Sequence, residues 1–100
     1  IKEDIVQVGQ LKLDPTKKVI SRKEKILALR PKEYALLEYL MRNVGKVIPK
    51  DELLKNVWLI SANNASNRLE VCMYHIRRKV NGENHQVLRT VRGYGYVIDA

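Results

Sequence analysis

The residues best suited to contact a ligand lie on one face of a helix that we expect at residues 66–80. The other face repeats apolar side chains at helical spacing and would pack on a core. The ligand-facing positions are Asn67, Arg68, Glu70, Val71, Tyr74, His75 and Arg78, with Arg77 at the flank. Arginine donates paired hydrogen bonds to guanine, asparagine pairs with adenine, and an apolar side chain can contact a thymine methyl group. The pattern also describes an ordinary solvated face whose basic end complements the helix dipole, and the helix alone leaves both interpretations open.

A second candidate group lies at a bend near the end of the sequence, where residues 90–98 read TVRGYGYVI. Gly93 and Gly95 permit dihedral angles that other residues avoid, so two strands can reverse there with little bulk at the tip. A narrow tip led by Arg92 can enter a DNA minor groove, whose negative potential attracts arginine. Thr90 can donate a hydrogen bond to a phosphate, and Tyr94 can lie along a sugar–phosphate edge. The alternative is an ordinary hairpin whose second strand packs on the core, and both descriptions can hold together.

The elements that must position these groups follow from turn residues and apolar periodicity. Residues 5–29 are apolar-rich or alternating between turn residues, which predicts a small antiparallel sheet of up to four strands. Apolar residues recur at the 3.6-residue period in three later segments. These segments predict helices at about residues 31–43, 50–58 and 66–80, followed by a hairpin at 87–98. The order predicts a single α+β domain, residues 1–100, in which the second and third helices form a helix-turn-helix.

The composition indicates a small basic domain. The chain has 100 residues and a formal net charge of +8, so it can bury one core and is suited to meet a polyanion. Charge alone does not distinguish nucleic acid from an anionic membrane, and an unspecialised basic surface is a further alternative. We expect no membrane span, because no run approaches roughly 20 apolar residues, and no signal peptide, because the first residues are charged. Cys72 is the single cysteine, which fits a reducing, cytoplasmic compartment.

Neither an enzyme nor a metal or cofactor site is expected. Cys72 and His75 form a Cys-x-x-His pair, which is half of a zinc site, and no second pair completes four ligands. The sequence has neither a P-loop nor a nucleophile elbow. RNA binding is the nearer rival, but aromatic residues make up only 6% of the chain and the N-terminal strands carry no stacking platform. A domain used only for protein contacts is a third class, which salt-sensitive binding to duplex DNA would exclude.

Five separated motifs carry a resemblance to a known family. They are PKE at residues 31–33, VIPKDELL at 47–54, Trp58, SNRLEV at 66–71 and RTVRGYGY at 89–96. With these motifs, residues 27–98 resemble the C-terminal winged-helix domain of OmpR/PhoB-type response regulators. The resemblance is specific because all five motifs occur in order and at the spacing of the family.

The resemblance implies a winged helix-turn-helix with a four-stranded antiparallel N-terminal sheet, three helices and a C-terminal hairpin wing. It implies sequence-specific binding of double-stranded DNA, with the third helix in the major groove and Arg92 of the wing in the minor groove. The domain would be the effector half of a two-component transcriptional regulator, whose upstream receiver domain is absent from this chain and takes part in a phosphorelay with a histidine kinase. Further implied partners are a second copy, bound head-to-tail on direct repeats, and RNA polymerase, contacted through the loop from Trp58 to Ala65.

Roles carry over to the matching positions. The resemblance implies phosphate contacts by Asn67, Arg68, Tyr74 and Arg77, and base-facing positions at Val71 and His75. It makes Arg92 the wing arginine, Thr90 its phosphate-contacting neighbour and Trp58 a ring whose N–H meets the DNA backbone. Arg78 and Tyr94, assigned from their own chemistry, complete the predicted DNA-binding set.

The start of the first helix departs from the family. Pro31 suits the first helical position, and Glu33 lies in the first turn, where the helix dipole favours a carboxylate. Arg30 stands where the family usually has a capping Thr or Ser. We therefore expect the missing cap to lower the stability of the helix by about 1 kcal/mol unless another group replaces it.

Overall fold

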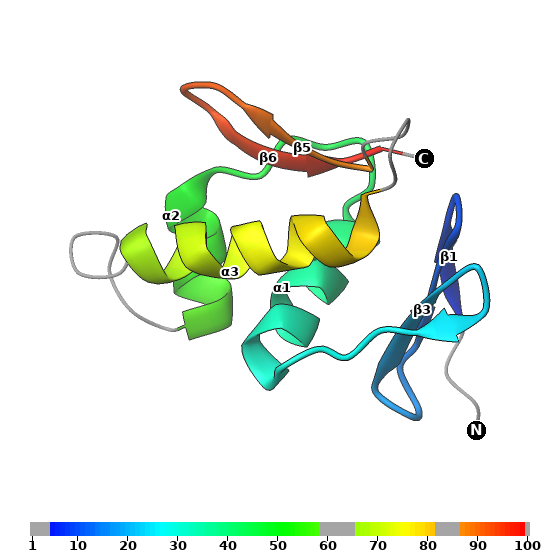
Figure 1. Cartoon of the computed structure of the whole chain (residues 1–100). Helices are drawn as coiled ribbons and strands as arrows, with labels where there is room; N and C mark the ends of the chain where they lie inside the picture. The colour runs from blue at the N-terminus through cyan, green and yellow to red at the C-terminus, as the bar shows by residue number, and fades with distance from the viewer. Residues whose placement is uncertain (1–4, 59–65, 82–86, 100) are drawn as a thin grey trace.

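The structure is a computed structural model that describes residues 5–58, 66–81 and 87–99, without the side chains of residues 66 and 67. Its elements are β1 (Val6–Val8), β2 (Leu11–Asp14), β3 (Val19–Arg22), β4 (Lys25–Ile26), α1 (Pro31–Arg42), α2 (Lys50–Leu53), a π-helical segment (Leu54–Trp58), α3 (Ser66–Val80), β5 (Leu88–Val91) and β6 (Gly95–Ile98). Figure 1 shows the sheet of β1–β4 at one side of the molecule and the β5–β6 hairpin along α3. The predicted fold class, with a four-stranded sheet, helices and a C-terminal hairpin, is confirmed.

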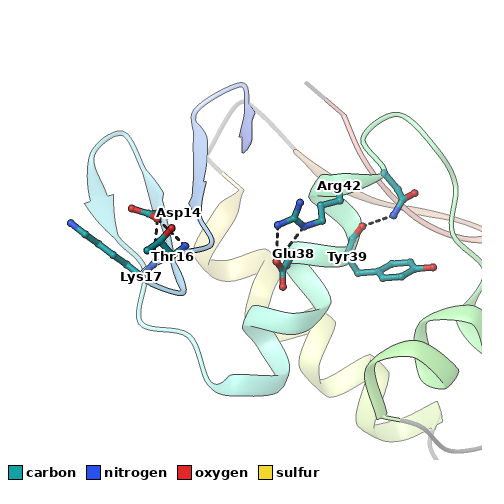
Figure 2. Close-up of polar contacts among 7 residues, drawn as sticks. Asp14, Thr16, Lys17, Glu38, Tyr39 and Arg42 are labelled. Carbon is teal, nitrogen blue, oxygen red and sulfur yellow. Dashed lines mark hydrogen bonds and ion pairs between the residues drawn. The ribbon is translucent and has the colours of Figure 1, made fainter. Parts of the chain in front are cut away.

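The N-terminal strands form an antiparallel meander in the order β1-β2-β3-β4. The side chains buried from this sheet are Val8, Leu11, Leu13 and Ile20. Asp14 shapes the turn after β2, because its Oδ1 accepts hydrogen bonds from the backbone N–H groups of Thr16 and Lys17 (Figure 2). A four-stranded sheet of this size needs a covering element, and α1 supplies it by packing against β1.

The turn between β3 and β4 has a backbone that glycine would suit better. Lys23 and Glu24 join the strands with φ angles of 50° and 68°, the left-handed pair of a type I′ turn. A residue with a side chain costs about 1 kcal/mol in that conformation. We expect Glu24→Gly to raise the free energy of unfolding by about 0.5–1 kcal/mol, measured by urea denaturation.

Thr16→Gly is the control for this turn. Thr16 is also an exposed turn residue, but its φ is not positive, so glycine there only adds freedom to the unfolded chain. The free energy of unfolding should fall in this variant. A fall in Glu24→Gly as well would show that the left-handed backbone is not a source of strain.

Helix α1 begins at Pro31 and buries Leu36, Leu37 and Leu40 on one face. Glu33, three residues after Arg30, accepts a hydrogen bond at its Oε1 from the Arg30 backbone N–H at 3.1 Å. This is half of a capping box, since the guanidinium of Arg30 has only donors and cannot return a bond. The cap that Arg30 cannot provide, a side-chain acceptor for an N–H of the first turn, is therefore missing, as expected from the sequence.

The second helix is not one regular helix over 50–58. It consists of the short α2 and then the π-helical segment, with Leu53, Leu54 and Val57 buried. Lys32 of α1 donates a hydrogen bond from its Nζ to the Val57 carbonyl at 2.9 Å, which satisfies an acceptor at the end of the segment. Tyr39 of α1 donates to Glu52 at 2.5 Å, so two polar contacts fix this unit against α1.

The C-terminal hairpin is anchored to the chain that joins α1 to α2. Ile48 and Tyr96 exchange two backbone hydrogen bonds, of 2.8 and 3.0 Å, so Ile48 adds a one-residue bridge to the edge of β6. The Gly45 N–H donates to the Ile98 carbonyl at 2.7 Å. Tyr96 and Ile98 are buried and join the core, as predicted from the sequence.

Among the described residues, no helix is both long enough and apolar enough to span a membrane.

Candidate nucleic-acid interface

Helix α3 presents the predicted polar face to solvent. Its buried side consists of Leu69, Cys72, Met73, Ile76 and Val80. Its exposed side consists of Arg68, Glu70, Val71, Tyr74, His75 and Arg78, with Arg77 half-buried at the flank. The side chain of Asn67 lies outside the described part. Val71 and Tyr74 are 57% and 55% exposed, which leaves them available for contact with a partner.

Tyr74 organises the middle of this face. Its hydroxyl accepts a hydrogen bond from Arg78 Nη1 at 3.1 Å, and the Arg78 guanidinium lies 5.7 Å from the centre of the ring. The ring of His75 meets Tyr74 edge-on, with 5.5 Å between ring centres. These contacts restrict the rotamers of three predicted contact residues, so less side-chain entropy is lost when a partner binds.

Glu70 is the acidic residue of α3, and a lysine of α2 offsets its charge. Lys50 Nζ lies 3.4 Å from Glu70 Oε1, and both side chains are about half exposed. Such an exposed pair contributes little to stability. Its effect is to keep the exposed face of α3 positive on balance.

The tip of the hairpin projects from its anchored base. Thr90, Arg92 and Tyr94 are exposed, and Tyr94 reaches 74% exposure. The Tyr94 N–H closes the turn on the Val91 carbonyl at 2.9 Å, and Gly93 has a φ of +80°. The tip therefore carries an exposed cation and an exposed aromatic ring with no core residue in it, and the contact roles of Arg92 and Tyr94 stay predictions.

Gly95 has a function that the sequence did not reveal. Its φ is +156°, and its Cα faces the backbone of the neighbouring segment, so that an added Cβ would overlap the Ile48 carbonyl oxygen. Glycine is thus required by the close approach of β6 to Ile48 as well as by the reversal of the chain. The sequence analysis assigned it to the reversal alone, because Ile48 is distant in sequence.

Asn81 joins the end of α3 to the start of β5. Its Oδ1 accepts hydrogen bonds from the N–H groups of Val87 and Leu88 at 2.9 and 3.0 Å, and its Nδ2 donates to the Leu88 carbonyl at 3.2 Å. The sequence patterns assigned no role to this asparagine, which lies between the predicted helix at 66–80 and the hairpin at 87–98. The available signal was an amide directly after a helix end, where it can bond to a returning strand.

Arg77 and Thr90 meet between the helix and the hairpin. The Arg77 guanidinium lies 5.8 Å from the centre of the Tyr96 ring. A cavity of about 320 Å³ between α3 and β5 is lined by Arg77, Asn81, Leu88, Arg89 and Thr90. Two residues predicted to contact phosphate therefore line one cavity, whereas Arg89 is paired across the hairpin with Val97 and lies on the opposite face from Thr90.

Trp58, the last residue of the π-helical segment, lies beside the exposed face of α3. It is half-buried and lines a largely apolar cavity of about 590 Å³ beside Arg68, Val71 and His75, with the first turn of α1 on the other side. The structure thus places the indole next to the predicted base-facing residues. Of the loop from Trp58 to Ala65, assigned to a polymerase contact, residues 59–65 lie outside the described part.

A buried carboxylate of α1 forms an ion pair with α3. Glu33 is 4% exposed and pairs with Lys79 of α3, with 2.6 Å between Oε1 and Nζ. Burial alone would raise the pKa of Glu33, but the hydrogen bonds from Lys79 and from the Arg30 N–H outweigh it, and the pKa is lowered. The pair fixes the C-terminal half of α3 against the first turn of α1.

Cys72 belongs to the packed side of α3. Burial raises the pKa of its thiol to about 11, with the charge of Glu33 as a secondary cause, so the thiol is protonated at neutral pH. A protonated, buried thiol is a poor nucleophile and a poor metal ligand. Cys72 is therefore part of the core and does not belong to the exposed face of α3.

Comparison with known proteins identifies the family. Residues 22–98 match the family model described as "Transcriptional regulatory protein, C terminal". The response regulator protein PmrA of Pseudomonas aeruginosa is 41% identical over 91 residues, which cover 91% of this chain and 40% of PmrA. The chain thus spans less than half the length of this relative.

Solved structures share the fold. The Klebsiella pneumoniae RstA DNA-binding domain, solved in complex with the RstA box, superposes with a TM-score of 0.86 at 22% identity, covering 97% of this chain and 98% of that one. Thermotoga maritima DrrB, an OmpR/PhoB homolog, superposes with a TM-score of 0.83 at 27% identity over 99% of this chain and 46% of DrrB. The motifs, the described fold and these matches agree: this chain belongs to the OmpR/PhoB-type response regulators and corresponds to their C-terminal DNA-binding domain.

Proposed function

We propose that the chain binds specific sequences of double-stranded DNA, with α3 in the major groove and the tip of the β5–β6 hairpin in the adjacent minor groove. The observation that carries this proposal is the exposed face of α3 lying beside an exposed arginine-tipped hairpin. Val71 and His75 face the bases, and Arg92 enters the minor groove, where the narrow walls concentrate negative potential. Arg68, Tyr74, Arg77, Arg78, Thr90, Tyr94, Trp58 and the undescribed side chain of Asn67 contact the sugar–phosphate backbone.

The charge of the domain supports the same proposal. A formal net charge of +8 in 100 residues favours association with a polyanion, and α3 and the hairpin contribute the exposed cations Arg68, Arg78 and Arg92. RstA, which has the same fold, is solved in complex with a DNA box. The chemistry requires neither a cofactor nor a metal nor an enzymatic step, because binding alone performs the task.

The wider assignment follows from family membership. We propose that the chain is the effector part of a two-component regulator with an upstream receiver domain, which a histidine kinase phosphorylates. On DNA it binds direct repeats as a head-to-tail dimer with a second copy. RNA polymerase contacts the loop that begins at Trp58, and the protein acts in the cytoplasm, where its DNA lies.

Selection of bound sites from random duplex DNA tests the proposal. A repeated short sequence should be enriched, with a spacing near one helical turn if two copies bind side by side. Binding to the selected duplex should weaken by orders of magnitude between roughly 50 and 200 mM salt, because several phosphate contacts release counterions. Absence of enrichment, or tighter binding to single-stranded RNA of any sequence, would reject the proposal.

Arg92→Ala tests the minor-groove contact. We expect the Kd for the selected duplex to rise roughly tenfold, and more for A/T-rich than for G/C-rich flanks, since the minor groove is narrowest in A/T-rich tracts. Arg42→Ala is the control, because it removes an equally charged side chain from the far end of α1, where Arg42 pairs with Glu38 (Figure 2). Equal Kd values for the two variants would exclude insertion of Arg92.

A further inference from the structure

We propose that His75 reads DNA in its protonated form, so that the domain takes up a proton when it binds and discriminates guanine from adenine more strongly as the pH falls. The inference rests on the proposed DNA-binding function and adds to it a specificity determinant that responds to pH. It starts from an imidazole at a position proposed to face the bases, where a change of charge alters the pattern of hydrogen-bond donors.

His75 lies on the exposed face of α3, one helical turn after Val71, with which it shares the proposed base-facing role. Its ring contacts the ring of Tyr74 edge-on, at an interplanar angle of 68° and with 5.5 Å between the ring centres. This contact limits the rotamers of the imidazole, while the exposed side of the ring remains open to a partner. His75 can therefore meet a base edge with little loss of side-chain entropy.

The two protonation states of an imidazole match different bases. The neutral ring has one N–H donor and one acceptor nitrogen, whereas the charged ring has two N–H donors and no acceptor. In the major groove, guanine presents two acceptors, N7 and O6, while adenine presents the acceptor N7 beside the N6 amino donor. Protonated His75 therefore suits guanine and opposes the adenine amino group, and the neutral form loses this distinction.

The charged side chains around His75 are mostly positive. The cations that follow it on α3 or line the cavity beside Trp58 with it are Arg30, Lys32, Arg68, Arg78 and Lys79. Among the described residues that line this cavity, Glu33 carries the negative charge, and Lys79 already pairs with it at 2.6 Å. The surplus of cations attracts phosphates, and the negative potential of the duplex then favours the charged form of His75 in the complex.

The other groups near His75 keep their charge across the range in which an imidazole titrates, about pH 5 to 8. Glu33 stays ionised, because its hydrogen bonds keep its pKa below the ordinary value of 4.5 in spite of burial. Cys72 stays protonated, because burial raises the pKa of its thiol to about 11. Lysine, arginine and tyrosine side chains ordinarily titrate above this range. The imidazole is therefore the expected source of a pH effect, and affinity should increase as the pH falls.

The experiment measures the Kd for the selected duplex at constant ionic strength from about pH 6 to about pH 8. In the wild type, the Kd should rise about three- to tenfold over this range, because a charged hydrogen bond to a base is replaced by a neutral one. Site selection repeated at both ends of the range should enrich guanine at one position at the lower pH. This preference should weaken at the higher pH.

Substitutions of the histidines identify the source of the effect. His75→Gln removes the titrating group, so its Kd should change by less than about twofold across the range. His75→Arg keeps its charge and paired donors at every pH, so it should select guanine at both ends. His85→Gln is the matched control, because His85 is the other histidine of the chain and does not belong to α3. This variant should keep the pH dependence of the wild type.

The outcomes distinguish this inference from the function on which it rests. A wild-type chain that binds no duplex at any pH would reject both. A wild-type chain that binds the selected duplex with one Kd throughout the range, or a pH dependence that survives in His75→Gln, would reject proton uptake by His75 alone. An unchanged base preference at the two ends would reject the role of the proton in specificity. Thermal unfolding of each variant at both ends checks that the fold is intact.

Discussion

Replacing Gly95 with alanine is expected to destabilise the domain by about 3 kcal/mol, a large fraction of the stability of a small domain. The added Cβ would overlap the Ile48 carbonyl oxygen and stand 2.9 Å from the Pro49 Cα. These are backbone atoms, so no side-chain rotation relieves the overlap. The φ of +156° adds strain, and separating the strands to make room would break the two hydrogen bonds between Ile48 and Tyr96.

Gly93→Ala is the matched control for Gly95→Ala. Gly93 also has a positive φ, of +80°, but an added Cβ there meets no atom within 4 Å. Gly93→Ala should therefore lower the free energy of unfolding only through the strain of the left-handed backbone, by about 1 kcal/mol. Urea unfolding at neutral pH measures both free energies. Similar values for the two variants would mean that the contact between β6 and Ile48 does not require glycine.

Removing the Glu33 carboxylate is the second substitution with a large expected effect. Glu33→Ala should lower the free energy of unfolding by about 2–3 kcal/mol, because the Arg30 N–H loses its cap and Lys79 loses its buried partner. Glu33→Gln should cost less, since the amide oxygen can still accept from Arg30. Glu38→Gln, in the exposed pair with Arg42, should cost about 0.5 kcal/mol or less.

The pH dependence identifies the charge of Glu33 as the cause. The pKa of Glu33 is lower in the folded chain than its ordinary value of 4.5. Its ionised form therefore stabilises the fold above that value, and this contribution is lost as the pH falls through the lower, folded pKa. Between neutral pH and about pH 3, the free energy of unfolding should fall less in Glu33→Gln than in the wild type. Parallel curves would show that the carboxylate charge does not stabilise the fold.

The sequence predicted the features that depend on neighbouring residues. The buried stripe of α3, from Leu69 to Val80, has helical spacing that only one face can satisfy. Tyr96 and Ile98 lie on one face of β6, and their burial agrees with the expectation that the second strand of the hairpin packs on the core, although all of Gly95–Ile98 is buried. The exposed positions of α3 then follow by exclusion, and the family motifs assigned their roles.

The features that the sequence did not predict depend on contacts between distant segments. Glu33 was recognised by its place in a first helical turn, but Lys79 is 46 residues away and its pairing with Glu33 has no local pattern. The π-helical end of the second helix accompanies packing against α1, including the contact of Lys32 with Val57.

The three hydrogen bonds of Asn81 have a consequence for the DNA sites that this domain can use. They fasten the residue that follows α3 to the first residues of the hairpin, the two elements proposed to contact DNA. One inserted base pair shifts the flanking sequence by about 3.4 Å and rotates it by about 34°. In the proposed binding mode, two contacting elements fastened together at Asn81 do not follow that displacement, so we expect a fixed phasing between the bases and the flank in the target sites.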